Sequence, residues 1–258
     1  MLEILKERET FTGKAGTGNL AMFFAILMIH AEKYFKTNQQ NQLKKWVDLH
    51  LLSMNKNGFW GKGKKNPHLQ FQNGYHQYEI FQYLDINLNE KKNNTENFVQ
   101  SLADKQGHFA PYPGGGGCFD YDAVFLLTFF YNKNIIKDNI LKKLRHTLIN
   151  YQNLDGGFCE SKYIRPLNIN YFKNILYHIY DKPLFAKEET LKYCLNLTRN
   201  KHKTIGTHWT QYNRAWDESN LWDSWFRMLS IAKIERYFKN QSFDWSFIDY
   251  PGIGFAKN

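Results

Sequence analysis

Asn57-Gly58-Phe59-Trp60 has two counterparts further along the chain, Gln106-Gly107-His108-Phe109 and Asp155-Gly156-Gly157-Phe158. The central glycines, at positions 58, 107 and 156, are 49 residues apart each time, and a weaker copy, Gly206-Thr207-His208-Trp209, has its aromatic residue 51 positions after Phe158. A period of this length indicates a stack of similar supersecondary units, none of which can bury its apolar face alone. We therefore expect one domain over residues 1–258.

Between these segments the hydrophobic pattern is helical. Residues 20–29 and 123–130 are apolar nearly all round, which is typical of helices buried on most sides, whereas 42–54 and 139–151 are amphipathic. Each unit should therefore contain an inner and an outer helix, and strands are hard to find. Inner helices are expected to begin near Asn19, His76, Asp122, Asn170 and Asp223, and outer helices to span about 40–54, 90–103, 138–152 and 187–199. The prediction is an all-α barrel of four helical hairpins and a fifth inner helix, with the inner helices around a cavity.

The repeated turns have a structural interpretation. A glycine just after a helix can adopt the left-handed conformation that satisfies the last helical carbonyl groups, and a following aromatic residue can pack over the helix end. We expect Trp60, Phe109 and Phe158 to have this role.

Composition limits the class of protein. No stretch approaches the roughly 18 apolar residues that span a bilayer, and the N-terminus lacks the pattern of a secretory signal, so we expect a cytoplasmic protein without a transmembrane segment. The three cysteines have no paired spacing, which argues against a disulfide framework. The net charge of +10 is compatible with nucleic acid, an acidic membrane surface or an anionic ligand, but the lysines are scattered and we expect no nucleic-acid partner.

Five polar residues share the entry position of the expected inner helices. They are Asn19, His76, Asp122, Asn170 and Asp223, and helix N-termini that converge on one mouth of a barrel would direct them into one space. We interpret them as substrate-binding residues. The alternative, a helix N-cap, stays open for the Asn and Asp residues but not for His76, since histidine is a poor cap.

The glycine-rich segment 113–124 contains two carboxylates, Asp120 and Asp122, just before an apolar stretch. On the wall of an aromatic cavity, desolvation and like-charge proximity would raise the pKa of one of them, and a protonated aspartic acid could act as a general acid. One aspartate could instead cap the helix while the other is solvated.

A second group of candidates is rich in tryptophan. Trp216, Trp222 and Trp225 are interleaved with Arg214 and Arg227, a mixture that suits a bulky apolar ligand, a cation over an aromatic face or a sugar ring. Core packing is the alternative for Trp225. Asp120, Asp122, His76, His208 and Asp223 could supply metal ligands, but no spacing selects a metal. We expect no cofactor and leave zinc and magnesium open.

Gln152-Asn153-Leu154-Asp155-Gly156-Gly157-Phe158 matches in full the Gln-x-x-Asp-Gly-Gly-Phe/Trp turn of a known superfamily. Over about residues 15–240 the chain resembles the α/α toroids of class II terpenoid cyclases and protein prenyltransferase β subunits. The resemblance implies an α/α toroid of about five helical hairpins. It also implies that the cyclase motif Asp-x-Asp-Asp falls on Asp120-Tyr121-Asp122-Ala123, with Asp122 as proton donor, Asp120 as its partner and Ala123 in place of the last aspartate. The prenyltransferase Asp-x-Cys zinc pair would fall on Asp120 and Asp122, without the thiolate.

The leading expectation is a cyclase-like, lyase-like or isomerase-like enzyme that acts on an isoprenoid or similarly bulky, lipid-like small molecule. A carbohydrate-active enzyme on an anionic glycan is the first alternative, with charges handled by Arg165, Arg214, Arg227 and His76. The second is a non-catalytic binding or assembly module, in which the toroid is completed by a homo-oligomer or a partner chain.

Overall fold

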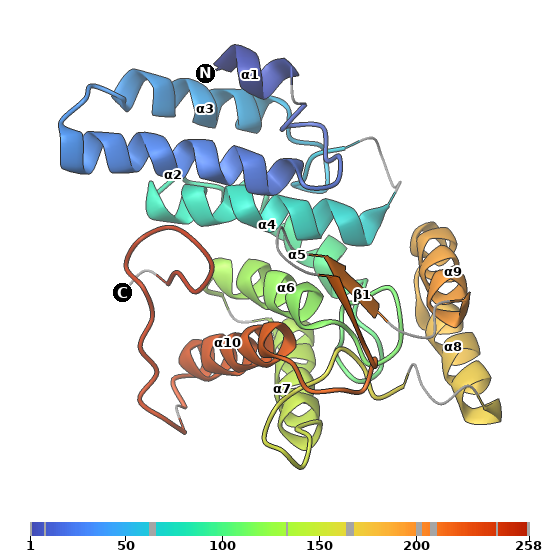
Figure 1. Ribbon diagram of the computed structural model, residues 1–258. Coiled ribbons are helices and arrows are strands. Elements are labelled where there is room, and N and C mark those ends of the chain that lie inside the picture. The colour runs from blue at the N-terminus through green and yellow to red at the C-terminus, as the bar shows by residue number, and fades with distance from the viewer. Residues whose placement is uncertain are drawn as a thin grey trace. The chain divides into compact units, whose positions relative to one another are not determined.

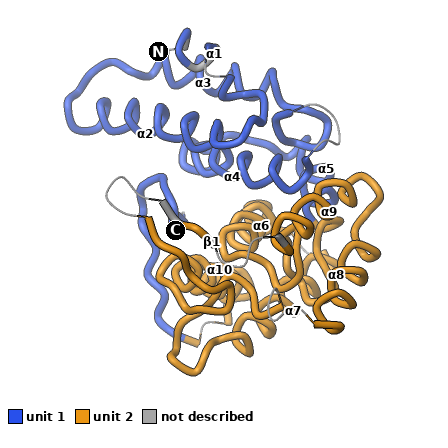
Figure 2. The backbone as a smooth tube through the Cα atoms, turned by 45° about the vertical axis from the view of Figure 1, so that its right-hand side comes forward, with its two compact units in different colours: residues 1–99, 243–258 blue, residues 100–242 orange. Residues whose placement is uncertain are grey.

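The computed structural model describes residues 2–7, 9–61, 66–132, 134–163, 168–199, 203–206, 211–240 and 242–256. Contacts group the chain into two compact units, residues 1–99 with 243–258 and residues 100–242 (Figure 2). We call them unit 1 and unit 2 and describe each by itself. In chain order the elements are α1 (Leu2–Glu7), α2 (Thr17–Phe35), α3 (Gln40–Leu52), α4 (Pro67–Tyr83), α5 (Lys92–Gln100), α6 (Gly117–Phe129), α7 (Ile135–Asn150), α8 (Ile169–Asp181), α9 (Leu184–Arg199), β1 (Lys203–Gly206), β2 (Gln211–Arg214) and α10 (Leu221–Phe238) (Figure 1).

The predominantly helical fold confirms the expected class, and most helix bounds lie close to those expected. His76 is an exception, because α4 begins at Pro67 and His76 lies in its middle. The antiparallel β1–β2 hairpin is a second departure: Gly206 belongs to a strand that pairs with β2, and Thr207 to Trp209 lie outside the described residues. Among the helices of the described residues, none is both long and apolar enough to cross a membrane.

The repeated turns share one backbone geometry. Gly58, Gly107 and Gly156 have φ angles of 83°, 88° and 83°, in the left-handed region that favours glycine. Each glycine N–H donates, at 3.0, 3.0 and 2.9 Å respectively, to the carbonyl three residues earlier, which belongs to Asn55, Asp104 and Asn153. The left-handed conformation is thus confirmed, but the expected capping role is wrong: the glycine closes a turn several residues after the helix instead of satisfying its last carbonyls.

The aromatic residues of these turns are core residues, as expected. Phe59, Trp60, Phe109 and Phe158 are all buried. In unit 1 the Trp60 Nε1–H donates to the His50 carbonyl at 2.9 Å, which joins the turn to the end of α3. The turns therefore attach each hairpin to the core of its unit.

Unit 1 is organised around α4, which is buried on nearly all sides and packs along α2 (Figure 1). A Cβ atom on Gly18 of α2 would lie 2.0 Å from the Asn73 carbonyl oxygen of α4, so only glycine allows the two backbones to approach this closely. The Trp46 Nε1–H of α3 donates to the Ala21 carbonyl of α2 at 3.1 Å. These contacts make α2, α3 and α4 one packed layer of helices.

Two buried histidines make unit 1 sensitive to acid. Burial lowers the pKa of His50 to about 4, although its hydrogen bond to the Trp46 carbonyl works in the opposite direction, and burial lowers the pKa of His76 to about 3. Both imidazoles are therefore neutral in the folded state at pH 7, whereas the unfolded chain takes up protons from about pH 6.5 downward.

We expect the stability of unit 1 to be fully retained above pH 6.5 and to fall as the pH drops toward 4, by about 1.4 kcal/mol per pH unit for each histidine. Urea denaturation at a series of pH values checks this slope. His76→Gln should flatten the slope by about half, while His146→Gln, which alters an exposed residue of unit 2, should leave it unchanged. Equal slopes in the wild type and His76→Gln would contradict the assignment.

Unit 2 is centred on the pair α6 and α10, and α7 also packs against α10. The helices approach closely at Gly117, where a Cβ atom would lie 3.0 Å from the Phe226 Cβ and 3.2 Å from the Asp223 carbonyl oxygen. The main helix contact of α8 is with α9. The extensive helix contact of α6 is with α10. Closure of a toroid stays a prediction.

Candidate functional site

A large pocket of unit 2 lies along the first turns of α10. It has a volume of about 1090 Å³ and is lined by Tyr212, Arg214, Asn220, Leu221, Trp222, Ser224, Trp225 and Met228. Leu221, Trp225 and Met228 are spaced i, i+4 and i+7, so they share one face of the helix. A concave, mainly apolar surface with a few polar groups is typical of a small-molecule site.

Two of the three candidate tryptophans line this pocket. Trp222 and Trp225 are 53% and 42% exposed, and both rings lie against Phe226, at centroid distances of 4.8 and 5.2 Å. Core packing is thus not the role of Trp225. Trp216 is instead buried, and its carbonyl accepts a hydrogen bond from the Ser161 N–H at 3.2 Å. The structure therefore assigns Trp216 to packing and the other two to the pocket wall.

A buried ionic cluster lies beneath the polar end of the pocket. The Arg214 Nη2 group donates to Glu160 Oε2 at 2.9 Å and to Asp223 Oδ2 at 3.0 Å, and all three side chains are buried. Two carboxylates thus share one guanidinium. Burial makes such a pairing strong, because the interaction is poorly screened.

Neutral donors complete this cluster. The Tyr112 hydroxyl donates to Glu160 Oε1 at 2.6 Å, the Asn220 amide donates to Asp223 Oδ2 at 2.7 Å, and the Gly117 N–H donates to Asp223 Oδ1 at 3.2 Å. Burial, followed by the charge of Glu160, raises the pKa of Tyr112 well above its ordinary value, so this phenol stays protonated as a donor. The carboxylates are therefore held in fixed orientations.

Arg227 and Asp120 belong to a second buried cluster. The Asp120 carboxylate lies 2.7 Å from His108 Nδ1 through Oδ2, accepts from the Phe109 N–H at 2.9 Å through Oδ1, and has Arg227 Nη1 at 3.5 Å. Arg227 also donates to the carbonyls of Gly114, Gly115, Cys159 and Glu160. These contacts hold two loops against α10, so both residues have a structural role in the fold of unit 2.

Asp120 and Asp122 do not form a facing pair. They are the fourth and sixth residues of α6, and side chains two positions apart on a helix point in different directions. Asp122 is 2% exposed and is not among the residues that line the pocket. The two carboxyl groups thus lie on different sides of α6, while the role of Asp122 as an acid stays a prediction.

The five expected rim residues have different surroundings. Asn19 and Asn170 are exposed, and Asn170 is the second residue of α8. Asp223 is instead buried in the cluster with Arg214. In unit 1, His76 is buried in α4. Neither Asn19 nor Asn170 is an N-cap: Gly16, Asn168 and Asn220 occupy those positions. Arg165 and His208 lie outside the described residues.

Several site residues are absent from the candidates chosen from the sequence. Leu221 and Met228 could have been found from their spacing with Trp225, which marks one helical face. Glu160 has no comparable signal, because it is 54 residues from Arg214 in sequence and no local motif connects them.

A smaller pocket of unit 2, of about 140 Å³, has Asp104 and His178 on its wall. Burial alone would raise the pKa of Asp104, but the His178 hydrogen bond and the positive charges of His108 and Lys182 hold it below its usual range. Burial lowers the pKa of Lys182 to about 8. In the described part of the chain, no three His, Cys, Asp or Glu side chains gather as metal ligands.

Comparison of the chain with protein-family models, with curated proteins and with solved structures gave no match.

Proposed function

We propose that the pocket along α10 binds a bulky, mainly apolar small molecule and that the protein acts on it as a cyclase-like enzyme, an isoprenoid being the class that the resemblance implies. The observation that carries the proposal is the composition of the wall. Trp222, Trp225, Leu221 and Met228 give the pocket an apolar side large enough for a branched hydrocarbon chain. The indole faces would also stabilise positive charge on the ligand.

The cluster of Arg214, Glu160 and Asp223 determines which charge the polar end of the ligand can carry. Arg214 is neutralised by two carboxylates, so it has little attraction left for a phosphate or carboxylate. An uncharged or cationic group fits this end better than an anionic one. This argues against the anionic-glycan alternative, in which Arg214 and Arg227 would bind acidic groups, since Arg227 is buried, its Nε and Nη2 donate to backbone carbonyls and its Nη1 lies 3.5 Å from Asp120.

Acid catalysis by Asp122 is part of the proposal and rests on the resemblance. The carboxyl group is buried on α6, the helix that packs against α10, so it belongs to the same core as the pocket wall. Desolvation favours the protonated form of a buried carboxyl group, which is the form that a general acid requires.

Calorimetric titration with farnesol, farnesylamine and farnesyl diphosphate tests the binding step. We expect the amine and the alcohol to bind and the diphosphate to bind at least about tenfold more weakly, which is about 1.4 kcal/mol. Trp222→Ala should weaken binding of the amine by at least about tenfold, because it removes a large aromatic contact. Leu154→Ala, at a fully exposed loop position of the same unit, is the matched control and should bind as the wild type does.

Asp122→Asn separates binding from chemistry in the same experiment. It should retain the affinity of the wild type and lose the conversion of farnesol to cyclic or dehydrated products, followed by mass spectrometry. Conversion by the variant would remove the acid role, and unchanged affinity in Trp222→Ala would remove the pocket.

A further inference from the structure

Helix α8 exposes a continuous apolar stripe. Ile169, Phe172, Leu176 and Tyr180 are 84%, 52%, 68% and 77% exposed, and their spacing of three or four residues places them on one side of the helix. The opposite side carries Tyr171, Ile175 and His178, which are buried. The stripe is therefore additional to the face that α8 contributes to the core.

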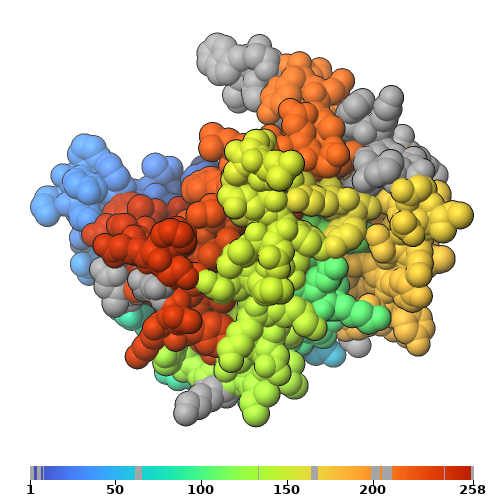
Figure 3. Space-filling view, turned by 90° about the horizontal axis from the view of Figure 1, so that it is seen from below, coloured from blue at the N-terminus to red at the C-terminus, as the bar shows by residue number. Residues whose placement is uncertain are grey.

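The stripe continues beyond the end of α8. Leu184, the first residue of α9, is 86% exposed, and Leu191 and Leu195 further along α9 are 46% and 48% exposed. Figure 3 shows this segment, coloured amber, at an edge of unit 2. Single exposed apolar residues are normal on a protein surface, but a contiguous group of this kind marks an interaction site.

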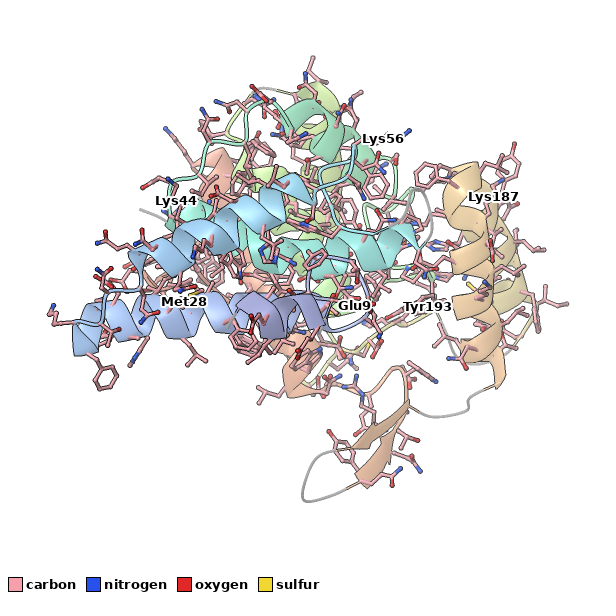
Figure 4. All side chains as sticks on the ribbon, turned by 90° about the horizontal axis from the view of Figure 1, so that it is seen from above. Glu9, Met28, Lys44, Lys56, Lys187 and Tyr193 are labelled. Atoms are coloured by element: carbon pink, nitrogen blue, oxygen red, sulfur yellow. The ribbon has the colours of Figure 1, made fainter. Side chains whose placement is uncertain are left out.

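Lysine side chains surround the aromatic rings of this face. Lys105 and Lys173 have their Nζ atoms 5.6 and 5.8 Å from the centroid of the Tyr177 ring, and Lys187 has its Nζ 5.6 Å from the Tyr180 ring. Lys187 and Tyr193 leave α9 on different sides (Figure 4), and Tyr193 contacts the rings of Tyr112 and Phe119 inside unit 2. The ammonium groups thus belong to the outer surface.

The charge of the face is positive. Asp181 forms an ion pair with Lys105 at 3.1 Å, which leaves the positive charges of Lys173 and Lys187 beside the apolar stripe. The whole chain carries a net charge of +10. Apolar and aromatic side chains bordered by lysines are the composition of helices that lie in the headgroup region of anionic bilayers.

We propose that the exposed face of α8, with Leu184, binds the surface of an anionic membrane. Ile169, Phe172, Leu176 and Tyr180 enter the boundary between headgroups and acyl chains, and Lys173 and Lys187 contact lipid phosphates. A second copy of the chain fits this face less well. A two-fold symmetric contact would bring the same lysines of both copies together, and like charges would oppose it.

Co-sedimentation with vesicles tests this inference with the full chain. The wild type should bind vesicles of phosphatidylcholine with phosphatidylglycerol at least about tenfold more strongly than vesicles of phosphatidylcholine alone, and the difference should shrink as salt is raised. Failure to bind the anionic vesicles would overturn the proposal.

Two sets of variants locate the binding face. Phe172→Ser with Leu176→Ser, and separately Lys173→Glu with Lys187→Glu, should each reduce binding to anionic vesicles by at least about tenfold. Leu154→Ser is the matched control, since it changes an equally apolar and more exposed residue away from α8, and it should bind as the wild type does. Wild-type binding by both double variants would overturn the assignment to α8.

Sedimentation velocity of the same proteins tests the alternative that a second copy of the chain binds this face. A dimer of the wild type that dissociates in Phe172→Ser with Leu176→Ser, without vesicle binding, would assign the face to a second copy. Farnesylamine binding by these variants shows whether the pocket along α10 is intact. The result for membrane binding is therefore separate from the result for the proposed function.

Discussion

Arg227→Met is expected to lower the free energy of unfolding of unit 2 by about 3–5 kcal/mol, the range observed when one partner of a buried ionic cluster is removed. The Arg227 side chain is 2% exposed. Its Nε donates to the Cys159 carbonyl at 3.2 Å, and its Nη2 donates to the Gly114 and Glu160 carbonyls at 3.1 and 2.8 Å and also to the Gly115 carbonyl.

The reason for so large an effect lies in what the substitution leaves behind. Methionine fills much of the volume of the arginine side chain but donates no hydrogen bond, so four buried carbonyls lose a donor. Asp120, with its Oδ2 3.5 Å from Arg227 Nη1, also loses a neighbouring positive charge. The loops at 114–115 and 159–160 both bond to α10 through this residue, so both lose contacts in one substitution.

Urea denaturation followed by circular dichroism measures the loss. Arg227→Lys should recover only part of it, because an ammonium group cannot reproduce the planar arrangement of the guanidinium donors. Lys192→Met is the control for removal of an ion pair: both Lys192 and its partner Glu188 are exposed, so we expect a change of about 0.5 kcal/mol or less. A loss below about 1 kcal/mol for Arg227→Met would show that the cluster contributes little to stability.

Local patterns in the sequence predicted the helices well. The apolar stretch 123–130 falls on α6 and its end, and the amphipathic stretch 139–151 falls on α7, because each pattern depends on residues a turn apart. The start of α4 was placed too late, at His76, although Asn66-Pro67 carried the signal. Proline favours the first position of a helix, where its missing N–H costs nothing.

The partners of the candidate site residues could not be predicted, because they are distant in sequence. In the anionic-glycan alternative, Arg214 and Arg227 would bind acidic groups, but Glu160 and Asp223 pair with the first, and backbone carbonyls and Asp120 surround the second. The same limit applies to the pairing of helices. The position of α10 beside α6 depends on the close approach at Gly117, a long-range contact that no local pattern reports.

The pocket itself was predictable in part. Trp222 and Trp225 were chosen for their density in the sequence, and that criterion also selected Trp216, which is buried. Exposure distinguishes these tryptophans, and it depends on tertiary packing that their density in the sequence does not report. The spacing of Leu221, Trp225 and Met228 carried the more specific signal, since it identifies the side of α10 that forms the wall.

Gly107→Ala should destabilise unit 2 by about 2–4 kcal/mol, of which about 1–2 kcal/mol is the cost of a left-handed conformation in a residue with a side chain. The remainder comes from steric overlap. An added Cβ atom would lie 2.8 Å from the Leu144 backbone nitrogen and 3.0 Å from the Ile140 carbonyl oxygen of α7. Backbone atoms in a helix cannot move aside as a flexible side chain can, so the turn and α7 must separate.

Gly156→Ala is a matched control from the same repeated turn. Its φ angle of 83° is close to the 88° of Gly107, but the nearest atom to an added Cβ is Gln152 Nε2, at 4.0 Å. We expect it to cost only the conformational part, about 1–2 kcal/mol. The difference between the two variants in urea denaturation therefore measures how tightly the 107 turn packs on α7. Equal losses would mean that the repeated glycines are required for the turn conformation alone, and a larger loss at 107 would show that this turn also sets the position of α7 in unit 2.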